Sequence, residues 1–119
     1  MNTLIIGASP KPHRYAFQAL QLLTDHQHNV LLFAKRGGQI EGHSVYSCLS
    51  QIDQVVHTVT LYVNPGILAT LLEDIIALAP KRLIFNPGTE SAVAIERLEA
   101  LGIECAIDCT LIMLREGRY

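Results

Sequence analysis

Short uninterrupted apolar runs alternate along the chain with longer segments in which apolar residues recur at helical spacing. The runs at 4–6, 30–33 and 83–85 are continuous, which is typical of parallel strands covered on both faces. Apolar residues in 15–23 and 67–78 lie three and four positions apart, the spacing of one face of a helix. The pattern therefore predicts buried strands that alternate with amphipathic helices.

Weaker signals complete this alternation. They predict a short strand at 44–46, a helical turn at 49–52, a β-branched strand at 55–63, a helix at 91–101 stopped by Gly102, and a last strand at 103–107. Strands that alternate with helices favour a parallel sheet joined by right-handed crossovers, with helices on both faces. We expect an α/β fold, a three-layer, doubly wound, Rossmann-like domain with a mainly parallel sheet of about 5–6 strands.

Length and composition bound the classes of protein that the chain can belong to. Its 119 residues suit one domain spanning 1–119, and 50% hydrophobic against 17% charged residues favours a folded core. A formal charge of -2 argues against wrapping a nucleic acid, whose binding grows with the number of phosphates neutralised. We expect a soluble domain that does not bind nucleic acid.

The chain carries no signal for export, membrane insertion, a disulfide framework or a metal. Its first residues lack the basic start of a signal peptide, and no apolar run approaches membrane-spanning length. The cysteines Cys48, Cys105 and Cys109 match no paired spacing, and the five histidines form no ligand set. We expect a cytoplasmic protein with reduced thiols, without a metal site and without contact to a membrane.

Polar turns follow the predicted strands at the edge where ligands bind. In an open parallel sheet the ligand crevice lies outside the carboxyl ends of the strands. The turns placed there are Gly7-Ala8-Ser9-Pro10-Lys11, Lys35-Arg36-Gly37-Gly38, Asn64-Pro65-Gly66, Asn86-Pro87-Gly88-Thr89 and Asp108-Cys109-Thr110. This edge is therefore the predicted site.

The first of these turns is a predicted phosphate site. Gly7 allows a sharp turn after the first strand, and the next helix offers free N–H groups and its positive dipole end to an anion. A short strand-to-helix loop also needs glycine for geometry alone. Neither the Gly-x-Gly-x-x-Gly fingerprint nor a Gly-Lys-Ser/Thr motif is present, so the turn does not name its ligand.

The end of the second strand discriminates between nucleotides. NAD-binding domains usually place an acidic residue there for the ribose hydroxyls, whereas this chain has Lys35 and Arg36. Two cations suit a phosphorylated ribose, as in coenzyme A or NADP, and Lys11 and Arg14 add charge near a diphosphate. The alternative interpretation is that these are solvated loop charges.

In their order and spacing these segments resemble one known family, the small stand-alone CoA-binding proteins related to the nucleotide-binding domain of the succinyl-CoA synthetase alpha subunit. The resemblance covers essentially the whole chain. It rests on Gly7-Ala8-Ser9-Pro10-Lys11-Pro12 with Arg14, Ile40-x-Gly42 leading to Val45-Tyr46-x-x-Leu49, Asn86-Pro87-Gly88, and Gly102 followed by Asp108-Cys109.

The resemblance implies a ligand, coenzyme A or an acyl-CoA, and assigns residues to it. Gly7, Ala8, Ser9 and Lys11 would line the diphosphate turn, Lys35 or Arg36 would face the ribose phosphate, Asn64 and Pro65 would cover the ligand, and Asn86, Pro87, Gly88 and Cys109 match the remaining family positions. The chain departs from relatives at Ala34-Lys35-Arg36, commonly Asn-Pro-Lys, and at Tyr15-Ala16, often Pro-Ser. The second departure removes a hydroxyl that caps the helix or touches phosphate.

The predicted function is binding without catalysis. In the ligase, chemistry needs a phosphorylated histidine from a second domain and an ATP-grasp partner, for which this chain has no room. Ser9, His13 and Cys109 form no demonstrable catalytic geometry in sequence, so no catalytic residue is assigned. The alternatives are a small NADP-dependent or other nucleotide-dependent enzyme, and an interaction domain that has lost its ligand. A homodimer or an unknown protein partner stays open.

Overall fold

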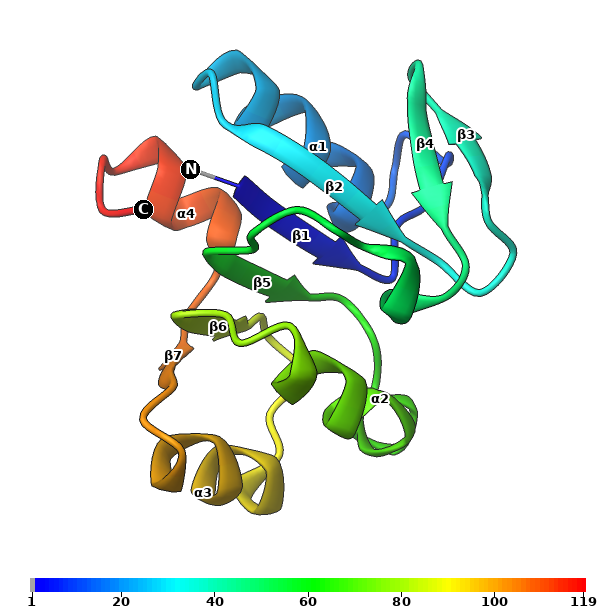
Figure 1. Cartoon of the computed structure of the whole chain (residues 1–119). Coiled ribbons are helices and arrows are strands. Elements are labelled where there is room, and N and C mark those ends of the chain that lie inside the picture. The colour runs from blue at the N-terminus through cyan, green and yellow to red at the C-terminus, as the bar shows by residue number, and fades with distance from the viewer. Residues whose placement is uncertain (1) are drawn as a thin grey trace.

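The computed structural model describes residues 2–119 as one sheet with helices on both faces (Figure 1). The strands are β1 (Asn2–Ile6), β2 (Asn29–Phe33), β3 (Gly38–Ile40), β4 (His43–Tyr46), β5 (Thr58–Leu61), β6 (Arg82–Phe85) and β7 (Glu104–Ile107). The helices are α1 (Tyr15–Asp25), α2 (Pro65–Ala77), α3 (Ala92–Ala100) and α4 (Thr110–Arg115), with a 3-10 turn η1 at Leu49–Gln51.

The sheet has seven strands in the order β3-β4-β2-β1-β5-β6-β7. Every neighbouring pair is parallel except β3 and β4, which form an antiparallel hairpin. The chain moves outward from β1 to β2 in one direction and from β5 to β7 in the other. Strand order therefore reverses between β1 and β5, and the ends of these two strands mark the expected crevice.

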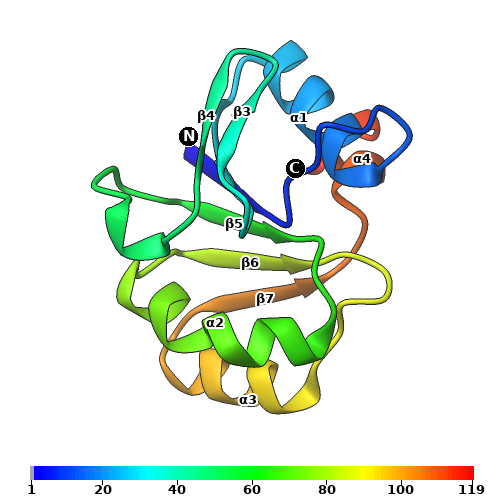
Figure 2. The same ribbon diagram turned by 90° about the vertical axis from the view of Figure 1, so that its right-hand side faces the viewer.

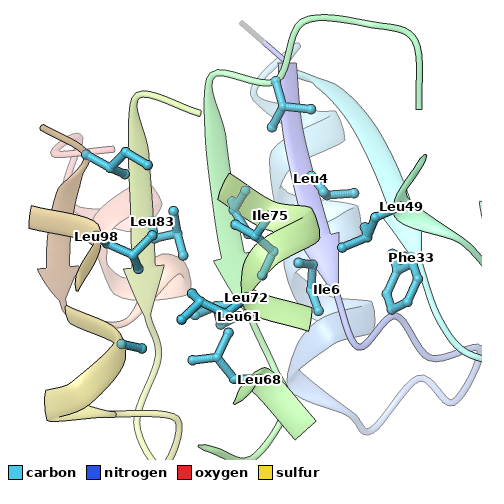
Figure 3. Packing of buried hydrophobic residues seen from close by; sticks show 14 of the residues in the cluster. Leu4, Ile6, Phe33, Leu49, Leu61, Leu68, Leu72, Ile75, Leu83 and Leu98 are labelled. Atoms are coloured by element: carbon cyan, nitrogen blue, oxygen red, sulfur yellow. The ribbon is translucent and has the colours of Figure 1, made fainter. Parts of the chain in front are cut away.

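Two apolar layers enclose the sheet (Figure 2). On one face, Leu4, Leu61 and Leu83 of the strands pack with Leu68 and Ile75 of α2, as Figure 3 shows. Residues of η1 and α3 join this layer. On the other face α1 and α4 pack together over the sheet. Strands buried on both faces explain the continuous apolar runs in the sequence.

The predicted α/β architecture is confirmed, with differences in detail. Strand β5 is confined to Thr58–Leu61, because residues 55–57 precede the ladder and Tyr62–Asn64 already belong to the next turn. Strand β3 and helix α4 were not predicted. β3 follows Gly37 and Gly38, which signal a loop, and α4 has only six residues. Short elements of this kind are held by tertiary packing rather than by a sequence pattern.

The end of the chain closes the amino edge of the sheet. The Tyr119 hydroxyl bonds to Thr3 Oγ1 at 2.6 Å, and the Arg82 guanidinium lies 4.7 Å from the centre of the Tyr119 ring. These contacts hold the segment after α4 against β1 and β6, opposite the predicted ligand edge. Of the helices in residues 2–119, none has the length and apolar character needed to cross a bilayer.

Candidate functional site

Gly7 leaves β1 in a conformation that a side chain would prevent. Its φ is +95°, and a Cβ added there would lie 2.7 Å from the carbonyl oxygen of Tyr62. The N–H groups of Gly7 and Ala8 both donate to the Phe33 carbonyl oxygen at 3.0 Å. The turn is therefore held between the ends of β2 and β5, at the point where strand order reverses.

Helix α1 begins beside this turn with an uncapped N-terminus. Its N-cap residue is Arg14, and within residues 2–119 no side chain accepts a hydrogen bond from the first turn as a cap. Ser9 Oγ instead accepts from the Lys11 N–H at 3.2 Å and shapes the loop. Free N–H groups and the positive end of the helix dipole thus face the crevice, an arrangement that favours an anion.

A cavity of about 420 Å³ opens over the turn and the start of α1. It is lined by Gly7, Ser9, Lys11, Arg14, Tyr15, Ala16, Tyr62, Val63, Asn64, Pro87, Gly88 and Thr89. We call it the phosphate cavity. Among these described residues the charged ones, Lys11 and Arg14, are both cations. The cavity brings together residues predicted from three separate turns of the sequence.

A larger cavity of about 710 Å³ lies on the α2 side of Gly7. It is lined by Gly7, Ala8, Phe33, Ala34, Lys35, Ser47, Cys48, Leu49, Val63, Asn64, Gly66, Ile67, Thr70, Leu71 and Asp74. We call it the α2 cavity. Lys35 lines it, whereas Arg36 and Pro65 are exposed and, in the described chain, line none of the cavities at this edge. The structure thus separates the two cations that the sequence left equivalent.

A third cavity, of about 340 Å³, lies between α1 and α4. It is lined by Tyr15, Gln18, Tyr62, Asn86, Pro87, Cys109, Leu111, Ile112 and Arg115. We call it the α4 cavity. Tyr15, Tyr62 and Pro87 also line the phosphate cavity, so the two adjoin. The three cavities follow one another along the carboxyl edge, with Gly7 between the first two.

Asn86 holds the floor of this edge together. Its side chain is 3% exposed; Nδ2 donates to Thr60 Oγ1 at 2.7 Å and to the Leu61 carbonyl at 2.8 Å. Its Oδ1 accepts from the Thr110 N–H at 2.8 Å, and the hydroxyls of Thr60 and Thr110 bond to each other at 2.8 Å. The amide is fully engaged inside the protein, so Asn86 positions β5, β6 and α4 rather than presenting free groups to a ligand.

Tyr62 forms the wall shared by the phosphate and α4 cavities. Its hydroxyl lies beside Thr60 and Thr110, but among residues 2–119 no group has hydrogen-bond geometry with it. Burial raises the pKa of the phenol to about 12, partly offset by the two threonines. The side chain is therefore neutral at physiological pH.

The remaining turns are shaped by their own side chains. Asn64 Oδ1 accepts from the Ile67 N–H at 2.9 Å and caps α2, which Pro65 begins. The Gly88 N–H donates to the Glu90 carboxylate at 3.1 Å. These contacts fix the two loops that border the phosphate cavity.

Cys109 lies in the turn between β7 and α4 and is half-buried in the wall of the α4 cavity. The preceding carboxylate of Asp108 accepts from the Cys109 N–H at 2.7 Å and from Arg118 at 2.8 Å. Its bond to Arg118, and then that to the backbone, lowers the pKa of Asp108. This pairing holds the turn that places Cys109.

Sequence analysis missed several lining residues. Tyr62 directly follows β5, and this position after a central strand was a usable signal. Cys48 and Arg115 gave no signal, because they reach the edge through η1 and the unpredicted α4. Among residues 2–119 no three His, Cys, Asp or Glu side chains gather as a metal site.

A Rossmann-like sheet with cationic cavities at its switch point defines a class of nucleotide-binding domain. Within this class, a family model described as CoA binding domain matches residues 1–115, and the chain belongs to this family. Membership supports binding of coenzyme A. A comparison with curated proteins finds no match.

Solved structures agree with this assignment. A protein described as uncharacterized is 40% identical with a TM-score of 0.90, covering 99% of this chain and 97% of its own. A conserved hypothetical protein from Pyrococcus furiosus is 26% identical with a TM-score of 0.80, covering 88% and 90%. A dinucleotide-forming acetyl-coenzyme A synthetase from Ca. Korarchaeum cryptofilum shares the fold at 15% identity and a TM-score of 0.74, over 87% of this chain and 25% of the synthetase.

Proposed function

We propose that this chain binds coenzyme A or an acyl-CoA along the carboxyl edge of its sheet and performs no chemistry of its own. The observation that carries the proposal is the Gly7 turn, where a side-chain-free backbone meets the uncapped start of α1. A diphosphate bound there accepts from free N–H groups and lies near Lys11 and Arg14.

The α2 cavity is the proposed place of the adenosine. Its volume of about 710 Å³ and its apolar wall of Phe33, Leu49 and Leu71 suit a base and a ribose. Lys35 supplies the cation for the ribose phosphate. A phosphorylated ribose also occurs in NADP, so discrimination between these ligands belongs to the test.

The buried polar groups at this edge support binding without catalysis. Asn86, Thr60 and Thr110 bond to one another and to the backbone, which leaves them no free proton or lone pair for a substrate. Among residues 2–119 no histidine lines the phosphate, α2 or α4 cavity. A general base of the commonest kind is thus not part of the proposed site.

Titration calorimetry and thermal unfolding with CoA, dephospho-CoA, 3′,5′-ADP, NADP and NAD test the proposal. We expect CoA to bind best, and a hundredfold excess over Kd to stabilise the protein by about 2.7 kcal/mol. Stronger binding of NADP than of CoA would favour the enzymatic alternative. No response to CoA or 3′,5′-ADP at millimolar concentration overturns the proposal.

Chromatography of acetyl-CoA incubated with the protein tests the second half of the proposal. We expect no thioester cleavage above the rate in buffer. Cleavage that is faster than in buffer and is lost in a Gly7→Val variant would show that the edge is catalytic.

A further inference from the structure

The α4 cavity has no part in holding a nucleoside or phosphates. It adjoins the phosphate cavity through Tyr15, Tyr62 and Pro87, on the side away from the α2 cavity. A ligand anchored by its phosphates at Gly7 therefore has two directions along the edge. If the nucleoside occupies one, the α4 cavity is open to the other end of the molecule.

The walls of the α4 cavity are suited to a short carbon chain. The side chains of Pro87, Leu111 and Ile112 line it, and Ile112 is 45% exposed. Tyr15 at the shared border is 69% exposed, which is unusual for so large a side chain. Exposed apolar groups around a cavity mark surface that a bound apolar group covers.

Its charge is equally specific. Among the lining residues Arg115 is the charged one, and within residues 2–119 its guanidinium forms no ion pair and no hydrogen bond. The arginines at 97 and 118, by contrast, are both paired with carboxylates. A cation in the last turn of α4 suits the helix dipole, but that role does not require it to line a cavity.

A free guanidinium is a strong recognition group for a carboxylate, because its N–H groups match two carboxylate oxygens. No aspartate or glutamate of the described chain lines the α4 cavity or the phosphate cavity. A ligand carboxylate would therefore meet one cation and no repulsion from these walls.

We infer that the α4 cavity holds the acyl group of an acyl-CoA, and that this acyl chain is short and ends in a carboxylate bound by Arg115. The inference rests on the proposed function, since the phosphates at Gly7 direct the acyl end into this cavity. A volume of about 340 Å³ limits the chain to a few carbons beyond the thioester. Long fatty acyl chains are excluded by the same limit.

Matched pairs of ligands test this inference by titration calorimetry. Malonyl-, succinyl- and glutaryl-CoA are compared with propionyl-, butyryl- and valeryl-CoA, which carry a methyl group in place of the terminal carboxylate. In at least one pair we expect the acid to bind about tenfold more tightly. Unsubstituted CoA is measured in parallel.

Variants assign the preference to one side chain. Arg115→Gln should remove the preference for the acid while leaving the affinity for CoA within about twofold, and Arg115→Lys should retain part of it. Arg97→Ala is the control, because it removes a cation of α3 that lines none of the three cavities in the described chain. It should leave the preference unchanged.

The outcomes separate this inference from the proposed function. If CoA binds and every acid equals its neutral partner, or if the preference survives in Arg115→Gln, the inference is wrong while CoA binding stands. If neither CoA nor any acyl-CoA binds, both fail. A preference lost in Arg115→Gln and kept in Arg97→Ala supports the inference.

Discussion

The side chain of Asn86 bridges to Thr60 at 2.7 Å and thereby ties the ends of β6 and β5 together beneath the candidate site. The same amide accepts from the backbone of Thr110 and donates to Leu61. One residue thus sets the relative positions of three elements whose following loops form the crevice. The role is structural, although sequence analysis placed Asn86 among the ligand-binding residues.

Replacing Asn86 by Ala should destabilise the fold. The change leaves a buried backbone N–H, a carbonyl and a threonine hydroxyl without their partner, and we expect a loss of about 2–4 kcal/mol in the free energy of unfolding. Urea unfolding followed by circular dichroism measures it. Gln21→Ala on the exposed side of α1 is the control and should change stability by less than about 0.5 kcal/mol. A cost at Asn86 no greater than at Gln21 contradicts the structural role.

Gly7→Ala should cost more than a left-handed backbone alone explains. Gly42 offers the comparison, since its φ is +79° and, in the described chain, no heavy atom lies within 4 Å of an added Cβ. We expect Gly42→Ala to cost about 1–2 kcal/mol and to keep CoA binding. Gly7→Ala should cost more and abolish binding, because its Cβ would lie 2.7 Å from the Tyr62 carbonyl oxygen. Equal costs and equal CoA affinities for the two variants refute the close-approach argument.

Lys35 and Arg36 should differ in their effect on the ribose phosphate. Lys35 lines the α2 cavity and Arg36 does not. We expect Lys35→Ala to weaken CoA about tenfold while changing dephospho-CoA little, because the lost contact is a charge-assisted one. Arg36→Ala should affect both ligands by less than about twofold. Calorimetric titration decides, and the reverse ranking would move the ribose phosphate outside the cavity.

The bond between Asp108 and Arg118 should make stability depend on acid pH. The pKa of Asp108 is lowered in the folded protein, first by Arg118 and then by the backbone of Cys109. A lowered carboxyl pKa contributes stability above the ordinary value near 3.8, and this contribution is lost as pH falls through the folded value. Asp108→Asn should therefore lower Tm at pH 7 and have progressively less effect below about pH 4. A difference in Tm that is unchanged at pH 2.5 contradicts this origin.

The cysteines should report on the path of the ligand. Cys48 lines the α2 cavity and Cys109 the α4 cavity, so bound CoA should slow the alkylation of both. Cys105 lies outside these cavities, and burial raises its pKa to about 11, so it should react slowly with or without ligand. Mass spectrometry after iodoacetamide treatment measures each site. Protection of Cys48 without protection of Cys109 would place the far end of the ligand outside the α4 cavity.

The fold was predictable wherever the sequence carried a strong period. Continuous apolar runs located β1, β2 and β6, and helical spacing located α1 and α2, because burial on both faces or on one face imposes those periods. Helix α4 was not predictable. Its six residues are held by packing against α1, and no side chain in the described chain caps its start.

The candidate site was predictable as far as backbone geometry leaves a trace in sequence. Gly7 was identified because a close approach demands glycine. Lys35 and Arg36 were indistinguishable, since adjacent residues differ only in direction, which the fold decides. Arg115 reaches the site through α4 and gave no sequence signal. The α4 cavity was thus invisible until α4 itself was placed.

The hairpin of β3 and β4 has a consequence for how a short chain accommodates a large ligand. Parallel strands such as β2 and β4 are usually joined by a helix that covers the sheet. Here the three residues of β3 make that connection, and the short turn η1 is the element nearest to the ends of β2 and β4 on the α2 face. The volume that a crossover helix would fill is left as the α2 cavity. The economy of the chain and its capacity for a nucleotide-sized molecule have one origin, an omitted helix.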